Sequence, residues 1–177
     1  MIFGAGPIGL LCVQAAMAAG ASRTVVVSRA GKRLEKAREL GATAVLNAND
    51  DDILQQIKAH TGDLGADVFI DAAGAQTTVT NGIASLRKGG RAVLVAVYTE
   101  PMTLNLMELV IREITIKGSI GYRHIFPQVI ELIAEKKLNV EQLITRKIKL
   151  DDIVKDGFDA LAYDRSEVKI LVQIDAN

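Results

Sequence analysis

Short runs of β-branched and aliphatic residues alternate with helical patterns along most of this chain. Several of these runs lack the polar alternation of a strand that has one face in water, which indicates strands buried on both faces. Such strands belong to parallel sheets that helices cover on both sides. We therefore predict a doubly wound α/β fold with six parallel strands, at residues 1–3, 24–28, 44–46, 66–71, 91–97 and 113–118.

Helical patterns fill the segments between these strands, and Gly20, Gly41 and Gly62 stand where three of the helices should end. After a further helix the rhythm changes to strand, helix and strand, without another βαβ period. We predict that this short appendage wraps onto the main domain or onto a neighbour. The predicted helices are 8–19, 32–40, 51–60, 76–87, 106–111 and 126–136, and the appendage contains a strand at 143–149, a helix at 151–163 and a strand at 168–174.

Composition excludes several classes of function. The chain has 177 residues, of which 49% are hydrophobic, and its 21 basic residues balance 21 acidic ones, so no basic excess is available to hold nucleic acid. The apolar stretches are too short to cross a bilayer and no charged leader precedes them, so we expect no membrane partner and a cytoplasmic location. One cysteine and two histidines provide no zinc-ligand spacing, which predicts no metal in this chain.

A glycine-rich loop, Gly4-Ala5-Gly6-Pro7-Ile8-Gly9, follows the first predicted strand and opens a helix. In this context Gly4 permits a tight turn, Gly6 lets a pyrophosphate approach the backbone, and Gly9 lets the helix pack on the strand. The helix N-terminus then faces the phosphates. We predict a Rossmann-type fold in which Gly4, Gly6, Pro7, Ile8 and Gly9 bind a dinucleotide. A plain glycine turn is an alternative, and methyltransferases and flavoproteins also stay open.

The end of the second strand predicts which dinucleotide is preferred. An acidic residue there would bind the 2′-hydroxyl of NAD, whereas this chain has the neutral Ser28 followed by Arg29. Arg33 lies four residues further, so two guanidinium groups could close on one 2′-phosphate, with Lys32 as a weaker charge. We therefore predict NADP as the cofactor, with NAD possible. The alternative is that these basic residues are an ordinary solvated helix start.

With these residues placed, nearly the whole chain resembles the zinc-dependent medium-chain dehydrogenase/reductase family. The resemblance is strongest to the alcohol and polyol branch that includes butanediol, sorbitol and threonine dehydrogenases. The block at 118–133 and the tail are specific to this branch. The stretches that carry the resemblance are GAGPIGLL (4–11), KARELGATAVLNA (36–48), GADVFIDAAG (65–74), GSIGYRHIFPQVIELI (118–133), ITRKIKLDDIVKDGFDAL (144–161) and KILV (169–172).

The resemblance implies a division of labour between two domains. Members of the family carry a catalytic zinc on an N-terminal domain and hold the nicotinamide beside it on the Rossmann domain, so that hydride passes between a secondary alcohol and the cofactor. This chain matches only the nucleotide-binding half, and we expect its first strand to be truncated just before the glycine loop. Residues 1–138 would form the dinucleotide-binding domain, and residues 139–177 a segment that packs on the catalytic domain in the family.

The resemblance also extends the candidate site. The turns after strands four and five, Ala72-Ala73-Gly74 and Ala96-Val97-Tyr98, should line the adenine-ribose and nicotinamide ends of the cofactor. Ser119 and Ile120, after strand six, should meet the carboxamide. No catalytic residue is predicted within this chain.

Other features favour structural roles. We expect Cys12 to be a small buried hydrophobe, His124 a surface or capping residue, and Asp50-Asp51-Asp52 a helix cap. No tyrosine is followed four residues later by lysine, which excludes the catalytic pair of short-chain dehydrogenases. The apolar residues Val110, Ile114, Ile116 and Ile120 near the last strand predict an open sheet edge and hence a homo-oligomer.

Two functions remain open from the sequence. The first is the NADP(H)-binding domain of a zinc-dependent alcohol or polyol dehydrogenase. The second is a non-catalytic dinucleotide-binding fragment or module. The resemblance also implies that the substrate pocket lies mostly in the other half of the family's proteins.

Overall fold

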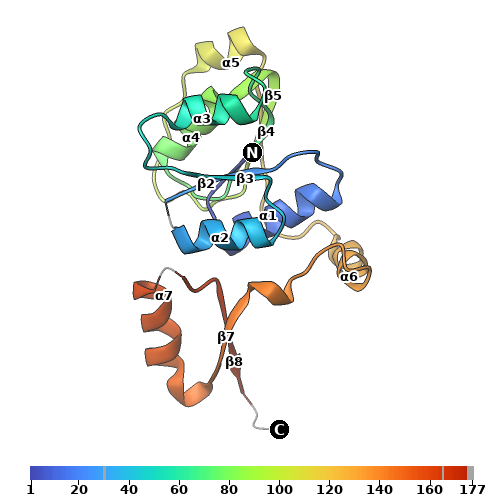
Figure 1. Ribbon diagram of the computed structural model, residues 1–177, viewed down its shortest axis with the longest axis vertical. Coiled ribbons are helices and arrows are strands. Elements are labelled where there is room, and N and C mark those ends of the chain that lie inside the picture. Colours follow the sequence, from blue (N-terminus) through green and yellow to red (C-terminus); the bar gives the residue numbers. More distant parts are fainter. Residues whose placement is uncertain (30, 165, 175–177) are drawn as a thin grey trace.

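The computed structural model describes residues 1–29, 31–164 and 166–174, and its main body is a six-stranded parallel sheet (Figure 1). The spatial order is β3-β2-β1-β4-β5-β6, so the chain winds outward from β1 in one direction and then returns to build the other half from β4. This is the strand order of dinucleotide-binding folds, and it confirms the predicted fold class. The strands are β1 Ile2–Phe3, β2 Val25–Ser28, β3 Ala44–Asn47, β4 Ala66–Asp71, β5 Leu86–Leu94 and β6 Thr115–Gly118.

Helices cover both faces of the sheet because both faces are apolar. Within β2, Val25 and Val27 pack on the side of the core that contains α3 and α4, whereas Val26 packs on the side of α1 and α2. On the first side the rings of Phe3 and Phe69 meet edge to face, with centroids 5.3 Å apart. The helices are α1 Pro7–Ala18, α2 Gly31–Glu39, α3 Ile53–His60, α4 Gln76–Ala84, α5 Leu106–Arg112 and α6 Phe126–Ala134.

One predicted strand differs from the structure by several residues. The fifth strand was expected at 91–97, but β5 begins at Leu86 and ends at Leu94. The backbone N–H groups of Val95 and Ala96 both donate to the carbonyl oxygen of Asp71, each at 3.0 Å, and this turns the chain away from the sheet. Residues 95–97 therefore belong to a turn at the carboxyl edge of the sheet.

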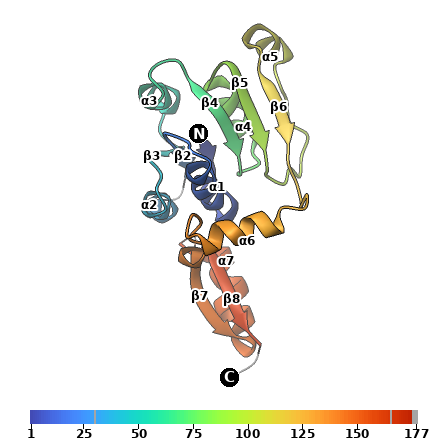
Figure 2. The ribbon, with the colours of Figure 1, turned by 90° about the vertical axis from the view of Figure 1, so that its right-hand side faces the viewer.

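The C-terminal segment forms a separate two-stranded parallel sheet below the main one (Figures 1 and 2). Leu143 and Val168 from this segment enter the buried cluster on the α1–α2 face, so the appendage packs on the main domain, which is one of the two placements that the sequence left open. Its helical part changes winding along its length. The elements are the 3₁₀ turn η1 Glu141–Leu143, β7 Ile144–Lys149, the 3₁₀ turn η2 Leu150–Asp152, the π-helical η3 Ile153–Asp159, α7 Ala160–Tyr163 and β8 Lys169–Gln173.

The aspartate cap predicted for the third helix is wrong. Asp52 is the residue before α3, but its side chain makes no capping hydrogen bond. The amide of Gln56 instead donates to the carboxylates of both Asp50 and Asp52, at 3.1 and 2.7 Å. The carboxylates of Asp50 and Asp52 are thus hydrogen-bonded by the side chain of Gln56, in the first turn of α3, and not by the helix backbone.

Within the described ranges, none of the helices has the length and apolarity needed to cross a lipid bilayer. Cys12 is half-buried on α1 and packs beside the cluster that contains Leu10 and Val13. Burial raises the pKa of its thiol, which fits the predicted role as a small hydrophobe.

Candidate functional site

The glycine loop connects the end of β1 to the start of α1 at the carboxyl edge of the sheet (Figure 2). Gly4 has a φ of 101°, which favours glycine, and its N–H donates to the carbonyl oxygen of Val27 at 2.9 Å. A Cβ atom on Gly9 would lie 1.8 Å from the carbonyl oxygen of Gly4, so α1 can approach the loop only through a glycine. These two glycines are required by the fold itself.

Gly6 differs from them because a Cβ atom placed on it would meet no heavy atom within 4 Å. Its φ of −76° is also open to any residue. The fold therefore does not require glycine here. The bare backbone faces open space at the start of the helix, which is the feature that a phosphate group needs for close approach.

The first turn of α1 has no partner of its own for its N–H groups. Gly6 is the N-cap residue and offers no side chain, and the first turn contains no acidic residue. Pro7 carries no N–H, whereas those of Ile8 and Gly9 point out of the helix end without an intrahelical acceptor. The helix dipole adds a positive potential, so this turn is suited to an anion.

Three turns at this edge of the sheet lie in direct backbone contact. A Cβ atom on Gly4 would lie 2.9 Å from the carbonyl carbon of Ala72 and 3.1 Å from the nitrogen of Ala73. A Cβ atom on Gly74, whose φ is 73°, would lie 2.8 Å from the carbonyl oxygen of Val97. The turns after β1, β4 and β5 therefore pack directly against one another along this edge of the sheet.

A buried carboxylate holds two of these turns together. The side chain of Asp71, at the end of β4, is fully buried. Its Oδ1 accepts hydrogen bonds from the N–H groups of Ala73 and Gly74, at 3.0 and 3.3 Å, and from the hydroxyl of Thr78 at 3.1 Å. Its Oδ2 accepts one from the hydroxyl of Tyr98, in the turn after β5, at 2.6 Å.

The sequence reasoning missed this network. Asp71 was assigned only as the last residue of a strand, and Tyr98 only as a member of a turn. A possible signal was an aspartate at the carboxyl end of a strand, followed by two small residues and a glycine. Its tyrosine partner is 27 residues away, however, and only the tertiary structure brings it to the carboxylate.

The remaining predicted residues of this edge are brought to the same side of the sheet. Ala73 is exposed in its turn and Ala96 is half-buried beside Gly74, while the side chain of Val97 is 79% exposed. Ser119 follows β6, where its N–H donates to the carbonyl oxygen of Leu94, and Ile120 is 88% exposed. Large apolar side chains that remain this accessible provide surface for a ligand or a partner.

The predicted phosphate-binding arginines have different surroundings. Ser28 ends β2 and is half-buried, and Arg29 is exposed just after it. Arg33, in the first turn of α2, donates from Nη2 to the carbonyl oxygen of Glu167 at 3.0 Å, and its Nε is buried with no hydrogen-bond partner among the described residues. The C-terminal segment therefore already holds one edge of Arg33, whereas Arg29 has its side chain in solvent.

No group of three or more histidine, cysteine, aspartate or glutamate side chains suitable for a metal ion is found among residues 1–29, 31–164 and 166–174. His124 has a φ of 58° and is exposed between β6 and α6. The side chains of these described residues thus do not fit a zinc ion.

Comparison with known proteins identifies the family to which this arrangement belongs. The family profile of the zinc-binding dehydrogenases matches residues 7–135, which run from the glycine loop to the end of α6. The chain belongs to this family. Its relatives include the (R,R)-butanediol dehydrogenase of Bacillus subtilis strain 168, which is 40% identical over 172 residues. That match covers 97% of this chain and 49% of the relative.

Solved structures of several dehydrogenases agree with the fold. A crystal structure of 2R,3R-butanediol dehydrogenase from Bacillus subtilis matches with a TM-score of 0.91 at 39% identity, over 98% of this chain and 50% of that one. An alcohol dehydrogenase from Escherichia coli CFT073, solved in complex with NADH, has a TM-score of 0.89 at 27% identity, over 98% and 51% of the two chains. A zinc-binding dehydrogenase from Sinorhizobium meliloti 1021, bound to NADP, has a TM-score of 0.87 at 30% identity, again over 98% and 51%.

The chain spans about half the length of the relatives it matches. It corresponds to the nucleotide-binding half of a zinc-binding dehydrogenase, as the sequence predicted. The family depends on a nicotinamide dinucleotide, and its solved members include complexes with both NADH and NADP.

Proposed function

We propose that this chain binds NADP(H), with its pyrophosphate on the glycine loop and its nicotinamide over the turns that follow β4, β5 and β6. The observation that carries the proposal is Gly6, whose bare backbone faces open space although the fold has room for a side chain there. The unpartnered N–H groups of Ile8 and Gly9 supply the anion site. Gly4 and Pro7 shape the loop, and Ala73, Ala96, Val97, Ser119 and Ile120 line the remaining edge.

The preference for NADP over NAD rests on the end of β2. Ser28 is neutral, so a 2′-phosphate meets no repulsion there, and the exposed Arg29 is free to turn toward it. Arg33 is the second guanidinium group, fixed on its other edge by Glu167. NAD remains usable because Ser28 can also hydrogen-bond a 2′-hydroxyl.

The reaction that this half serves is hydride transfer between a secondary alcohol or polyol and the cofactor. The substrate class is inferred from relatives whose names specify butanediol and sorbitol dehydrogenases. When bound, the nicotinamide supplies the hydride acceptor or donor. The residues of this chain bind and orient it, and the described residues hold no site for the zinc that names the family. A cytoplasmic location and the division into residues 1–138 and 139–177 stay predictions.

Titration of the purified chain with NADPH and with NADH tests the proposed function. The chain contains no tryptophan, so the emission of the reduced nicotinamide itself reports binding without overlap from indole. We expect saturable binding of both cofactors, with NADPH bound more tightly. ADP should displace either one, because it occupies the same glycine loop. Absence of saturable binding for both cofactors would contradict the proposal.

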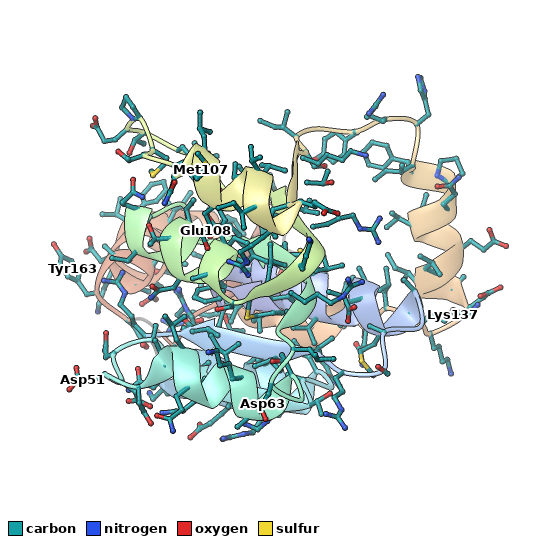
Figure 3. The ribbon with its side chains drawn as sticks, turned by 90° about the horizontal axis from the view of Figure 1, so that it is seen from above. Asp51, Asp63, Met107, Glu108, Lys137 and Tyr163 are labelled. Atoms are coloured by element: carbon teal, nitrogen blue, oxygen red, sulfur yellow. The ribbon has the colours of Figure 1, made fainter. Side chains whose placement is uncertain are left out.

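We also propose that a second copy of the chain pairs at the open edge of the sheet. β6 has β5 as its neighbour on one side, and its other edge is free in the described chain. The structure refines the predicted patch, since Ile114 and Ile116 pack on the core whereas Val110 and Ile120 are 72% and 88% exposed. In Figure 3, Met107 marks α5 at the outer surface of the molecule. Light scattering should report a dimer, and Val110→Lys should shift it toward monomer.

A further inference from the structure

The contact between Asp71 and Tyr98 crosses from one cofactor-lining turn to the next. Asp71 ends β4 and fixes the turn after β4 through the N–H groups of Ala73 and Gly74. Tyr98 closes the turn after β5, and its hydroxyl is the donor that reaches the second oxygen of the same carboxylate. Beyond β5 the backbone N–H groups of Val95 and Ala96 donate to the carbonyl oxygen of Asp71, and the Tyr98 hydroxyl adds a bond to its buried carboxylate, so the main chain and the side chain of one residue together fix the turn after β5.

The donors that hold this carboxylate are neutral. Among the ion pairs between described residues, none includes Asp71, and its hydrogen bonds come from two backbone N–H groups and two hydroxyls. A buried carboxylate depends strongly on each donor, because water cannot replace one that is lost. Desolvation and the adjacent Asp71 raise the pKa of Tyr98 well above its usual value, so its hydroxyl keeps its proton.

We propose that Tyr98 is a positioning residue for the cofactor. Through its hydrogen bond to Asp71, it holds the turn of Ala96 and Val97 in the position that the nicotinamide half of the dinucleotide requires. This inference rests on the proposed function. Tyr98 itself is half-buried and packs against the sheet core. Its effect on the ligand is transmitted through the backbone of residues 95–97.

The geometry separates the role of Tyr98 from that of the other hydroxyl donor. Thr78 lies on α4, and its hydroxyl is 3.1 Å from Asp71 Oδ1, the oxygen that also serves the turn after β4, and 2.8 Å from the carbonyl oxygen of Ala75. Loss of the Thr78 hydroxyl removes a hydrogen bond from the same buried carboxylate, but it leaves the turn after β5 anchored. A general loss of stability and a specific displacement of the second turn can thus be told apart within one network.

The test compares Tyr98→Phe with Thr78→Val and with Tyr163→Phe. Tyr163 is 85% exposed on α7 and lies at the periphery of the molecule in Figure 3, so its variant controls for loss of a phenolic hydroxyl. Calorimetric titration of each protein with NADPH and with ADP gives two dissociation constants. ADP reaches the glycine loop but lacks the nicotinamide half, so the ratio of the two constants reports on the turns that line that half, and the comparison of the variants assigns a change to the turn after β5.

For Tyr98→Phe we expect NADPH binding to weaken about tenfold while ADP binding stays within about twofold of wild type, as for loss of one hydrogen bond to a charged group. Thr78→Val should lower the melting temperature yet keep the wild-type ratio, and Tyr163→Phe should change neither quantity. An unchanged ratio in Tyr98→Phe, or an equal change in Thr78→Val, would overturn the inference. If wild type binds neither ligand, the proposed function fails first and the inference fails with it.

Discussion

Gly9 packs so closely against the backbone of Gly4 that there is room for a hydrogen atom but not for a methyl group. A Cβ atom on Gly9 would lie 1.8 Å from the carbonyl oxygen of Gly4 and 2.9 Å from its carbonyl carbon. The first helix is thereby pressed against the loop that precedes it. Gly6, between them, has open space in place of such a contact. The three glycines of one motif are therefore present for two different reasons, and mutation can separate them.

Gly9→Ala should destabilise the fold. The added methyl group overlaps backbone atoms that cannot rotate away, so we expect a loss of about 3 kcal/mol in the free energy of unfolding, at the upper end for overpacking. Denaturant unfolding followed by circular dichroism measures it. Gly31→Ala is the matched control, because Gly31 also begins a helix but has free space around its Cβ position. Equal stability of the two variants would contradict the proposed packing.

Gly6→Ala should weaken cofactor binding without destabilising the fold. Its backbone conformation suits alanine, so the unfolding free energy should stay the same or rise by about 0.5 kcal/mol. The methyl group occupies the space proposed for the pyrophosphate, and binding of both NADPH and NADH should fall at least about tenfold. The same fluorescence titration checks this outcome. A variant that binds as tightly as wild type would place the dinucleotide elsewhere.

Arg29→Ala should reduce the discrimination between cofactors. A charge-assisted contact with the 2′-phosphate contributes about 1.5–3 kcal/mol, so NADPH binding should weaken by about ten- to a hundredfold while NADH binding is unaffected. Arg23→Ala is the control, since Arg23 is also exposed but precedes β2, at the opposite end of the strand. An equal effect on both cofactors would show that Arg29 does not contact the 2′-phosphate.

Arg146→Met should loosen the C-terminal segment. Nε and Nη2 of Arg146 donate to Oε1 of Glu167, at 2.9 and 2.6 Å, and Glu167 is 6% exposed. Removal of the cation leaves a buried carboxylate without its charged partner, which costs about 3 kcal/mol. Limited proteolysis should then cut the segment faster. Lys147→Met, at the exposed neighbouring position, should have little effect, and similar cleavage of the two variants would refute the role of the ion pair.

Stability should fall in alkaline solution because of Tyr98. Burial and the neighbouring Asp71 raise the pKa of Tyr98 above its value in the unfolded chain, so folding favours the protonated phenol. The corresponding stability is complete below the unfolded pKa of about 10 and is lost progressively above it. Thermal unfolding of wild type and Tyr98→Phe across this range measures the difference. The melting temperatures should converge as pH rises, and a constant gap would contradict the assignment.

Local patterns in the sequence were sufficient to predict the fold class and the glycine loop. The apolar runs that became β2 and β4 have no polar face, so they had to lie in a sheet covered on both sides. The spacing of Gly4, Gly6 and Gly9 between a strand and a helix predicted an anion site because each glycine acts on its immediate backbone. The limits of β5 were less accurate, since its bend depends on the carbonyl of Asp71 in another strand.

Contacts between distant segments were decided only by the tertiary structure. Asp71 meets Tyr98 across 27 residues, and Arg33 meets Glu167 across 134, and neither pair has a periodicity or motif that links its members. A hydrogen bond needs its two atoms within about 3 Å, a condition that the folding of the whole chain satisfies and local propensity does not encode. The sequence by itself therefore determined the loop on which we propose that a dinucleotide binds, and the folded chain decided which side chains hold that loop and its neighbouring turns in place.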